Sequence, residues 1–280
     1  MKDYFGSYGK YIDVNGVKTH YYDIGKGMPL ILIHGGGVCV ASAIQWRYNI
    51  EKLSENFRII APDQLGFGMT EVPKNPDYSL TERAEHIAGL LKVLGIESAA
   101  LCGQSQGAWI ASYIYFEHPE LVSKLIFCNT GSITMERGRA STKFDFDSQL
   151  NLEATREFYS RIVFNKDLIT EEMVELAYEY GKRNFETRRK DQDSHSATEE
   201  GRMLNNSYRG KHISNFINRI KVPTLIVWGA NDVVPVEKGF WLYNQIKGAE
   251  ISVLQNAGHL VFMDRYRVFN SLLKMHIMGE

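Results

Sequence analysis

One stretch of the chain, AALCGQSQG at residues 99–107, points to a specific fold and chemistry. An apolar strand, Ala99–Cys102, is followed by the pattern G-x-S-x-G and then by a helix that we expect over Gly107–Phe116. A sharp strand-to-helix turn exposes the hydroxyl of its central residue, and close passage of neighbouring chain requires glycine on both sides. We therefore take Ser105 as the candidate nucleophile. It precedes a helix N-terminus, where negative charge is favoured.

Strand-like and helix-like segments alternate around this turn. Pro29–Ile33 is a continuous apolar run, as expected of a strand buried on both faces. Thr81–Leu94 has helical periodicity with Thr81 as the expected N-cap, and a closing helix is expected from Asp264 onward. The remaining expected strands are Val17–Asp23, Arg58–Ala61, Leu125–Cys128, Val222–Trp228 and Ile251–Leu254. This alternation predicts an α/β fold with a mostly parallel central sheet flanked by helices.

The pattern changes between residues 132 and 216, which are charged and rich in helical periodicity, as in Ala154–Phe164 and Glu171–Asn184. We therefore expect one core domain, residues 1–131 and 217–280, with an inserted helical lid at 132–216. A separate middle domain is the alternative. Sheet-like sequence on both sides of the segment favours the insertion.

Composition excludes several classes of protein. The 280 residues are enough for one large core, and the formal net charge is -1 with Lys and Arg scattered along the chain. A nucleic-acid partner would need a basic stripe, which is absent. No apolar run approaches the roughly 18 residues that cross a bilayer, and the first ten residues lack the apolar core of a signal peptide. We expect a cytoplasmic protein with no membrane or nucleic-acid partner.

The cysteines do not suggest a disulfide or a zinc site. Cys39, Cys102 and Cys128 are an odd number without a C-x-x-C pair, and buried free thiols are the expected state. We expect no metal and no cofactor. The expected partner is a small-molecule substrate, and a homodimer is compatible with the sequence.

A serine hydroxyl needs a base, and the base needs an acid that orients it. His259 fits the first role best, because it lies in a loop after the strand Ile251–Leu254, at the strand end where open α/β sheets place their sites. Asp232 follows the preceding strand and fits the second role. The alternative for Asp232 is that it only caps a turn. The order Ser105, Asp232, His259 along the chain matches a Ser-Asp-His hydrolase triad.

The sequence HGGG, residues 34–37, follows the first buried strand. Its glycines allow a backbone N–H to face the nucleophile. With the N–H of Gln106 it would form an oxyanion hole, and Gly36 and Gly37 are both candidates. His34 is interpreted as structural. The alternative for this loop is a tight turn without catalytic use.

Five motifs together resemble the α/β-hydrolase superfamily over essentially the whole chain. They are HGGG (34–37), PDQLGFGMT (62–70), GQSQG (103–107), WGANDVVP (228–235) and NAGH (256–259). Within the superfamily the chain looks most like the meta-cleavage product hydrolases, which split a carbon–carbon bond in vinylogous 1,5-diketones formed by aromatic-ring fission. In the second motif Asp63 is interpreted as structural. The HGGG form, the Leu-Gly-Phe-Gly stretch and the segment Leu168–Glu172 carry the closer resemblance.

That resemblance implies a substrate site. An arginine after the lid segment binds the substrate carboxylate in the family, and Arg183 occupies the matching position. A solvated lid arginine is the alternative. Gln104, Gln106 and Leu260 stand where the family has Asn, Met and Trp, and Val38-Cys39-Val40 replaces Pro-Gly-Ala. The side chains expected to contact substrate are Gln45, Gln104, Arg183, Leu260 and the lid aromatics Phe164 and Phe185.

Three functions fit these observations. The first is a serine-dependent hydrolase that cleaves a carbon–carbon bond in a carboxylated substrate, which Arg183 favours. The second is a carboxylesterase, lactonase or amidase with the same triad, which the longer Gln side chains favour slightly. The fold cannot decide between them. The third is a non-catalytic ligand sensor, against which the intact triad argues.

Overall fold

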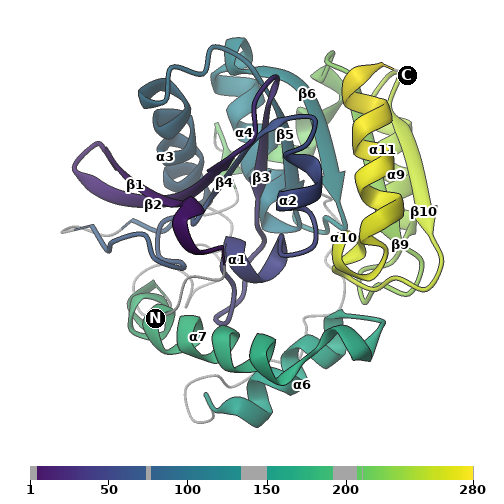
Figure 1. The fold of residues 1–280 in the computed structure, drawn as a ribbon. Helices are drawn as coiled ribbons and strands as arrows, with labels where there is room; N and C mark the ends of the chain where they lie inside the picture. Colours follow the sequence, from purple (N-terminus) through teal and green to yellow (C-terminus); the bar gives the residue numbers. More distant parts are fainter. Residues whose placement is uncertain (1–4, 74–76, 134–149, 192–206, 210, 280) are drawn as a thin grey trace.

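A computed structural model describes residues 5–73, 77–133, 150–191, 207–209 and 211–279 of the chain. Its centre is an eight-stranded sheet with the order β1-β2-β4-β3-β5-β6-β9-β10 (Figure 1). The strands are β1 Gly9–Val14, β2 Val17–Ile24, β3 Pro29–Ile33, β4 Arg58–Pro62, β5 Ala99–Gln104, β6 Val122–Cys128, β9 Thr224–Gly229 and β10 Glu250–Leu254. Strand β2 runs opposite to the other seven strands and pairs antiparallel with β1 and β4, while all other pairs are parallel, so the expected mostly parallel sheet is confirmed.

Alternate residues of each central strand enter two different apolar cores. In β3, Leu30 and Leu32 pack on one face and Ile31 and Ile33 on the other, and none of the four has exposed surface. Both faces are buried, which explains why the strand sequence is continuously apolar. One core includes residues of α1 Ser42–Gln45, α2 Ile50–Leu53, α10 Val261–Asp264 and α11 Tyr266–Met278; the other includes α3 Leu80–Val93, α4 Gln106–Glu117 and α9 Glu237–Gln245.

The structure differs from the sequence-based expectation in several local details. Ser79, not Thr81, caps α3, since its hydroxyl accepts the Glu82 N–H at 3.2 Å. Strand β1 and helices α1, α2 and α9 were not expected. β1 is a half-exposed edge strand, and α1 and α2 have only four residues each, too short for a clear periodicity.

Two helices of the expected lid, α6 Leu152–Ile162 and α7 Glu171–Asp191, lie beyond one end of the sheet (Figure 1). Helix α7 packs on the loop after β3. There the buried Asn184 amide donates to Val38 O at 2.9 Å and Val40 O at 3.1 Å. Residues 134–149 and 192–206 of the expected lid lie outside the described residues.

The last part of the expected lid contacts the core domain. Strands β7 Ser207–Tyr208 and β8 Lys211–His212 pair in an antiparallel manner, and a 3-10 turn, Ile213–Asn215, follows them. The Tyr208 hydroxyl donates to the Glu117 carboxylate of α4 at 2.5 Å, and Ile213 is buried in the core beside α4. Two-residue strands show no periodicity, so this return to the core could not be seen in the sequence.

In the described part of the chain, no helix is long and apolar enough to cross a membrane. Cys39, Cys102 and Cys128 are buried and form no disulfide, as expected.

Candidate active site

The turn between β5 and α4 holds Ser105 in an unusual backbone conformation, with φ 49° and ψ -112°. A positive φ is costly for a non-glycine residue and persists where surrounding contacts impose it. Here the Ser105 N–H donates to Cys128 O at 2.9 Å. Its carbonyl accepts the hydroxyls of Thr130 at 3.0 Å and Ser132 at 2.9 Å. The neighbouring strand and its following loop therefore fix the backbone of Ser105.

The two glycines of the motif are required by close backbone approach. A Cβ atom at Gly103 would lie 2.3 Å from Gly107 O, and one at Gly107 would lie 2.3 Å from Ile33 O and 2.7 Å from His34 O. Any side chain at either position would displace backbone. The G-x-S-x-G spacing thus follows from the tight packing of the turn against β3.

The imidazole of His259 lies against the carboxylate of Asp232. Nδ1 of His259 is 2.9 Å and 3.0 Å from the two carboxylate oxygens of Asp232. Only 1% of the Asp232 side chain is exposed, so this interaction is shielded from water. With Nδ1–H donated to the carboxylate, Nε2 is the ring nitrogen that can accept a proton from a nucleophile.

Asn129 is a site residue that sequence analysis missed. It follows β6 directly, is fully buried and has φ 45°. Its amide nitrogen donates to Asp232 Oδ2 at 2.6 Å and to Gly258 O at 3.4 Å. A polar residue at the carboxyl end of a buried parallel strand was the available signal, because that edge of the sheet is where sites form.

The sheet brings the three expected catalytic residues to one edge. Strands β5, β6, β9 and β10 are consecutive neighbours and parallel, so their carboxyl ends lie together. Ser105 follows the first of these strands, and the loops bearing Asp232 and His259 follow the last two. The amide of Gln104, the residue before Ser105, donates to His259 O at 3.3 Å and links the first loop to the last.

The glycine loop 34–37 lies against the start of α4. A Cβ atom at Gly36 would lie 2.6 Å from the side-chain oxygen of Gln106, whereas one at Gly37 would face Val40 and Phe158 at 2.9 and 3.0 Å. Of the two candidates, Gly36 is therefore the glycine packed beside Gln106. The Gly35 N–H is not available to a substrate, since it donates to Gln45 Oε1 at 2.8 Å.

The structure places the expected substrate-contacting residues in different surroundings. Leu260 has no exposed surface and packs in the core, so it does not line an open pocket here. Phe164 is 42% exposed, and the lid aromatic that approaches the glycine loop is Phe158 instead. Phe185 is partly buried. Amphipathic periodicity identified the lid helices but not which of their aromatic side chains faces the core.

Gln45 and Gln104 are each 1% exposed. Their side chains bind Gly35 N and His259 O, so in this structure both support the catalytic loops. Arg183 is an exposed residue of α7, and its guanidinium donates to Met69 O at 3.4 Å. It lies beside the loop of the second motif, and its carboxylate-binding role remains a prediction.

His34 and Asp63 occupy structural positions. Asp63 is buried and accepts His20 Nδ1 at 2.8 Å, Ser42 N at 2.8 Å and Met69 N at 2.9 Å. Burial alone would raise the pKa of this carboxyl, but hydrogen bonds and the charge of His20 hold the pKa below its usual value. His34 is fully buried and accepts the Gln64 N–H at Nε2, 3.1 Å away.

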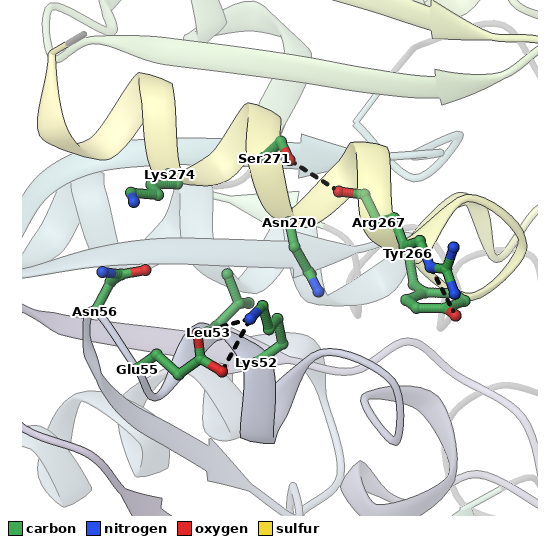
Figure 2. Close-up of a pocket in the computed structure, with 9 residues that line it drawn as sticks. All are labelled: Lys52, Leu53, Glu55, Asn56, Tyr266, Arg267, Asn270, Ser271 and Lys274. Atoms are coloured by element: carbon green, nitrogen blue, oxygen red, sulfur yellow. Dashed lines mark hydrogen bonds and ion pairs between the residues drawn. The ribbon is translucent and has the colours of Figure 1, made fainter.

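A separate hollow of about 600 Å³ lies between α2 and α11 (Figure 2). Its charged lining consists of Lys52, Glu55, Arg267 and Lys274, and no member of the Ser105, Asp232 and His259 set lines it. It offers no activated nucleophile. Within the described ranges, no group of three or more His, Cys, Asp or Glu side chains could hold a metal ion.

Comparison with known proteins identifies the family. The model of the alpha/beta hydrolase fold family matches residues 28–266, most of the chain, and the chain belongs to this family. It is 27% identical to 2-hydroxymuconate semialdehyde hydrolase of Pseudomonas sp. (strain CF600), over 95% of this chain and 92% of that protein. It is 29% identical to 2-hydroxy-6-oxo-6-(2'-aminophenyl)hexa-2,4-dienoic acid hydrolase of Metapseudomonas resinovorans, over 91% and 86% of the two chains.

A solved structure of a similarly named hydrolase has the same fold. The meta-cleavage product hydrolase from Pseudomonas fluorescens IP01 superposes with a TM-score of 0.83 at 27% identity, covering 97% of this chain and 98% of that one. The fold and the resemblance inferred from the sequence are confirmed, and the chain is an enzyme of the hydrolase class.

Proposed function

We propose that this alpha/beta hydrolase cleaves a carbon–carbon bond in a carboxylated vinylogous 1,5-diketone, of the kind formed by aromatic-ring fission. The observation that carries the proposal is the similarity, along nearly the whole chain, to hydrolases named for such 2-hydroxy-6-oxo-dienoates. The arrangement of Ser105, Asp232 and His259 at one sheet edge supports it, because hydrolysis needs a nucleophile and a base oriented by an acid.

Each group then has a defined role. His259 Nε2 takes a proton, either from the Ser105 hydroxyl that attacks the ketone or from a water that Ser105 orients; both routes use the same groups. The N–H groups of Gly36 and Gln106 stabilise the oxyanion. The acyl carbon gains the hydroxyl of water, and the departing carbon gains a proton. A dienol substrate makes that departure feasible, because ketonisation turns the leaving fragment into a stabilised dienolate equivalent.

Arg183 would anchor the substrate carboxylate from the lid. A planar guanidinium binds a carboxylate through two parallel hydrogen bonds, which a lysine cannot do. Arg183 is exposed, and the Met69 carbonyl occupies one edge of its guanidinium at 3.4 Å. That long hydrogen bond is weak enough to yield to a carboxylate.

We further propose that the enzyme works in the cytoplasm on a free small-molecule substrate without a cofactor. Its three thiols are free and buried, which suits a reducing compartment.

A substrate screen tests the reaction. Chromogenic ring-fission products should be cleaved by the wild type, while Ser105→Ala and His259→Ala should each lose several orders of magnitude in kcat. EDTA should leave the rate unchanged. Turnover of either variant within tenfold of wild type would contradict the assignment. Hydrolysis of neutral aryl esters but of no dienol acid would make the enzyme a carboxylic ester hydrolase instead.

Arg183→Ala tests the anchor, with Lys182→Ala as the matched control. Lys182 is the adjacent exposed cation, and it pairs with Glu179 within α7. Arg183→Ala should sharply raise KM for carboxylated products and spare neutral aryl esters, which have no carboxylate to lose. Lys182→Ala should change neither. Equal losses on both substrate types would show that Arg183 is only structural.

A further inference from the structure

The end of the lid helix α6 touches the loop that carries His259. Leu260 N donates to Ile162 O at 3.3 Å, and a Cβ atom at Gly258 would lie 2.7 Å from the same carbonyl. The residues on both sides of His259 therefore lie against the last turn of α6. This contact brings together segments about a hundred residues apart in the chain.

One buried carboxylate strengthens this contact. Asp264, the last residue of α10, is 9% exposed. Its Oδ2 accepts Gly258 N at 2.8 Å and Phe164 N at 3.0 Å, and its Oδ1 accepts Asn165 N at 2.8 Å. Hydrogen bonds to an ionised acceptor are about twice as strong as neutral ones. Asp264 thus binds the loop beside His259 and the chain just after α6 through a single rigid group.

The geometry leads us to propose that Asp264 is a positioning residue that couples the lid to the general base. The inference rests on the proposed function in one respect, the role of His259 as that base. Any shift of Phe164 and Asn165 would move Asp264 and, through it, the Ala257–Gly258 peptide, whose N–H Asp264 binds next to His259. A displacement of about 1 Å at a catalytic group can cost on the order of a hundredfold in rate. The lid would then set not only which substrate enters but also whether the base is in place.

The competing interpretation is that Asp264 only stabilises the fold. A structural role would lower the melting temperature without changing the rate of the folded enzyme. A positioning role predicts a fall in kcat with little change in KM. A role confined to the lid's substrate contacts predicts the reverse, a rise in KM with kcat retained.

The first experiment substitutes the carboxylate itself. Asp264→Asn keeps the shape of the side chain but replaces one acceptor oxygen with a donor that faces backbone N–H groups. We expect kcat to fall at least tenfold with KM within about twofold of wild type. Asn270→Ala is the control, because it removes the buried hydrogen bond to Asn49 at 2.8 Å without touching the His259 loop, and should lower only the melting temperature.

The second experiment leaves Asp264 and the His259 loop intact and acts from the lid. Asn165→Pro removes the N–H that Asp264 binds, and its φ of -80° suits proline. Asn165→Ala is its matched control, since both variants lose the side-chain bond to Asp167 N but only the first loses the backbone donor. We expect kcat to fall several-fold in Asn165→Pro and to stay unchanged in Asn165→Ala.

The outcomes separate the two proposals. Full kcat in Asp264→Asn and Asn165→Pro, with Ser105→Ala inactive, would overturn the coupling and leave the triad chemistry standing. A rise in KM alone would also overturn it. Should Asp264→Asn fail to fold, equal rates in Asn165→Pro and Asn165→Ala would still refute the coupling.

Discussion

Removing the amide of Asn129 tests whether the acid of the triad needs support from β6. Asn129→Gly deletes the 2.6 Å bond to Asp232 and the weaker one to Gly258 O. Glycine adopts the local φ of 45° without strain, so the backbone should stay in place. The Asp232 side chain is 1% exposed, and water cannot easily replace the lost donor.

The magnitude follows from these contacts. A hydrogen bond to a charged group contributes about 1.5–3 kcal/mol to the free energy of unfolding. Each kcal/mol corresponds to roughly 2–4 °C in a protein of this size class, so Tm should fall by about 3–12 °C. Asn129→Ala should lose a further 1–2 kcal/mol or so, because alanine is strained at positive φ. Loss of one of the bonds that orient Asp232 should lower kcat about tenfold to a hundredfold while KM stays nearly constant.

The assay is thermal unfolding together with steady-state kinetics on the best substrate. Ser112→Ala is the control, since its buried hydroxyl donates only to Ala108 O within α4 at 2.8 Å, away from Asp232. It should lower Tm slightly and leave kcat unchanged. If Asn129→Gly kept kcat within twofold of wild type and melted at the same temperature, Asn129 would not be orienting the triad.

Two further predictions concern stability. Burial lowers the pKa of His86 from its ordinary value of 6.5 to about 4. Between these pH values the unfolded chain therefore binds a proton on His86 that the folded chain does not bind. The free energy of unfolding should fall as the pH drops from 6.5 towards 4. Chemical denaturation should show a loss of about 2 kcal/mol from pH 6.5 to 5, reduced in His86→Gln; a slope unchanged by that substitution would contradict the argument. Gly107→Ala should lower the free energy of unfolding by about 3 kcal/mol or more, because its Cβ would lie 2.3 Å from Ile33 O. The control is Gly131→Ala, whose Cβ would lie 3.1 Å from a methyl group of Val234 and which should cost much less. Similar melting temperatures for the two variants would disprove the close packing of the turn.

Most of the sheet could be predicted because its signal is local. A buried parallel strand needs a continuous apolar run, and β3, β5, β6 and β9 each contain one. The nucleophile turn was equally visible, since close backbone approach leaves glycine as the only residue at positions 103 and 107. Strand β1 and the four-residue helices α1 and α2 were missed because half-exposed or very short elements have no comparable constraint.

The substrate site was harder to predict than the triad for a physical reason. Ser105, Asp232 and His259 follow strands, and strand order places their loops at one edge. The lid has no such register: a helix can rotate about its axis, so periodicity cannot say that Phe158 rather than Phe164 approaches the glycine loop. A resemblance to a family predicts which position matches a family residue, but not how the side chain at that position is buried. Leu260, expected beside the substrate, has no exposed surface.

The contacts of Asn129 and Asp264 could not be predicted from the sequence, because their partners are backbone groups or lie far along the chain. The place of Asn129 directly after an apolar strand was a signal for the residue but not for its partners. The two side chains bind the same residue: the Asn129 amide donates to Gly258 O and the Asp264 carboxylate accepts Gly258 N. Both polar backbone atoms of Gly258 are therefore hydrogen-bonded. Its oxygen is bound by Asn129 at the end of β6, and its N–H by Asp264, which also binds the chain after α6. A loop held on both sides by Asn129 and Asp264 can keep His259 against Asp232 before substrate arrives. Preorganisation of this kind reduces the reorganisation required during the reaction.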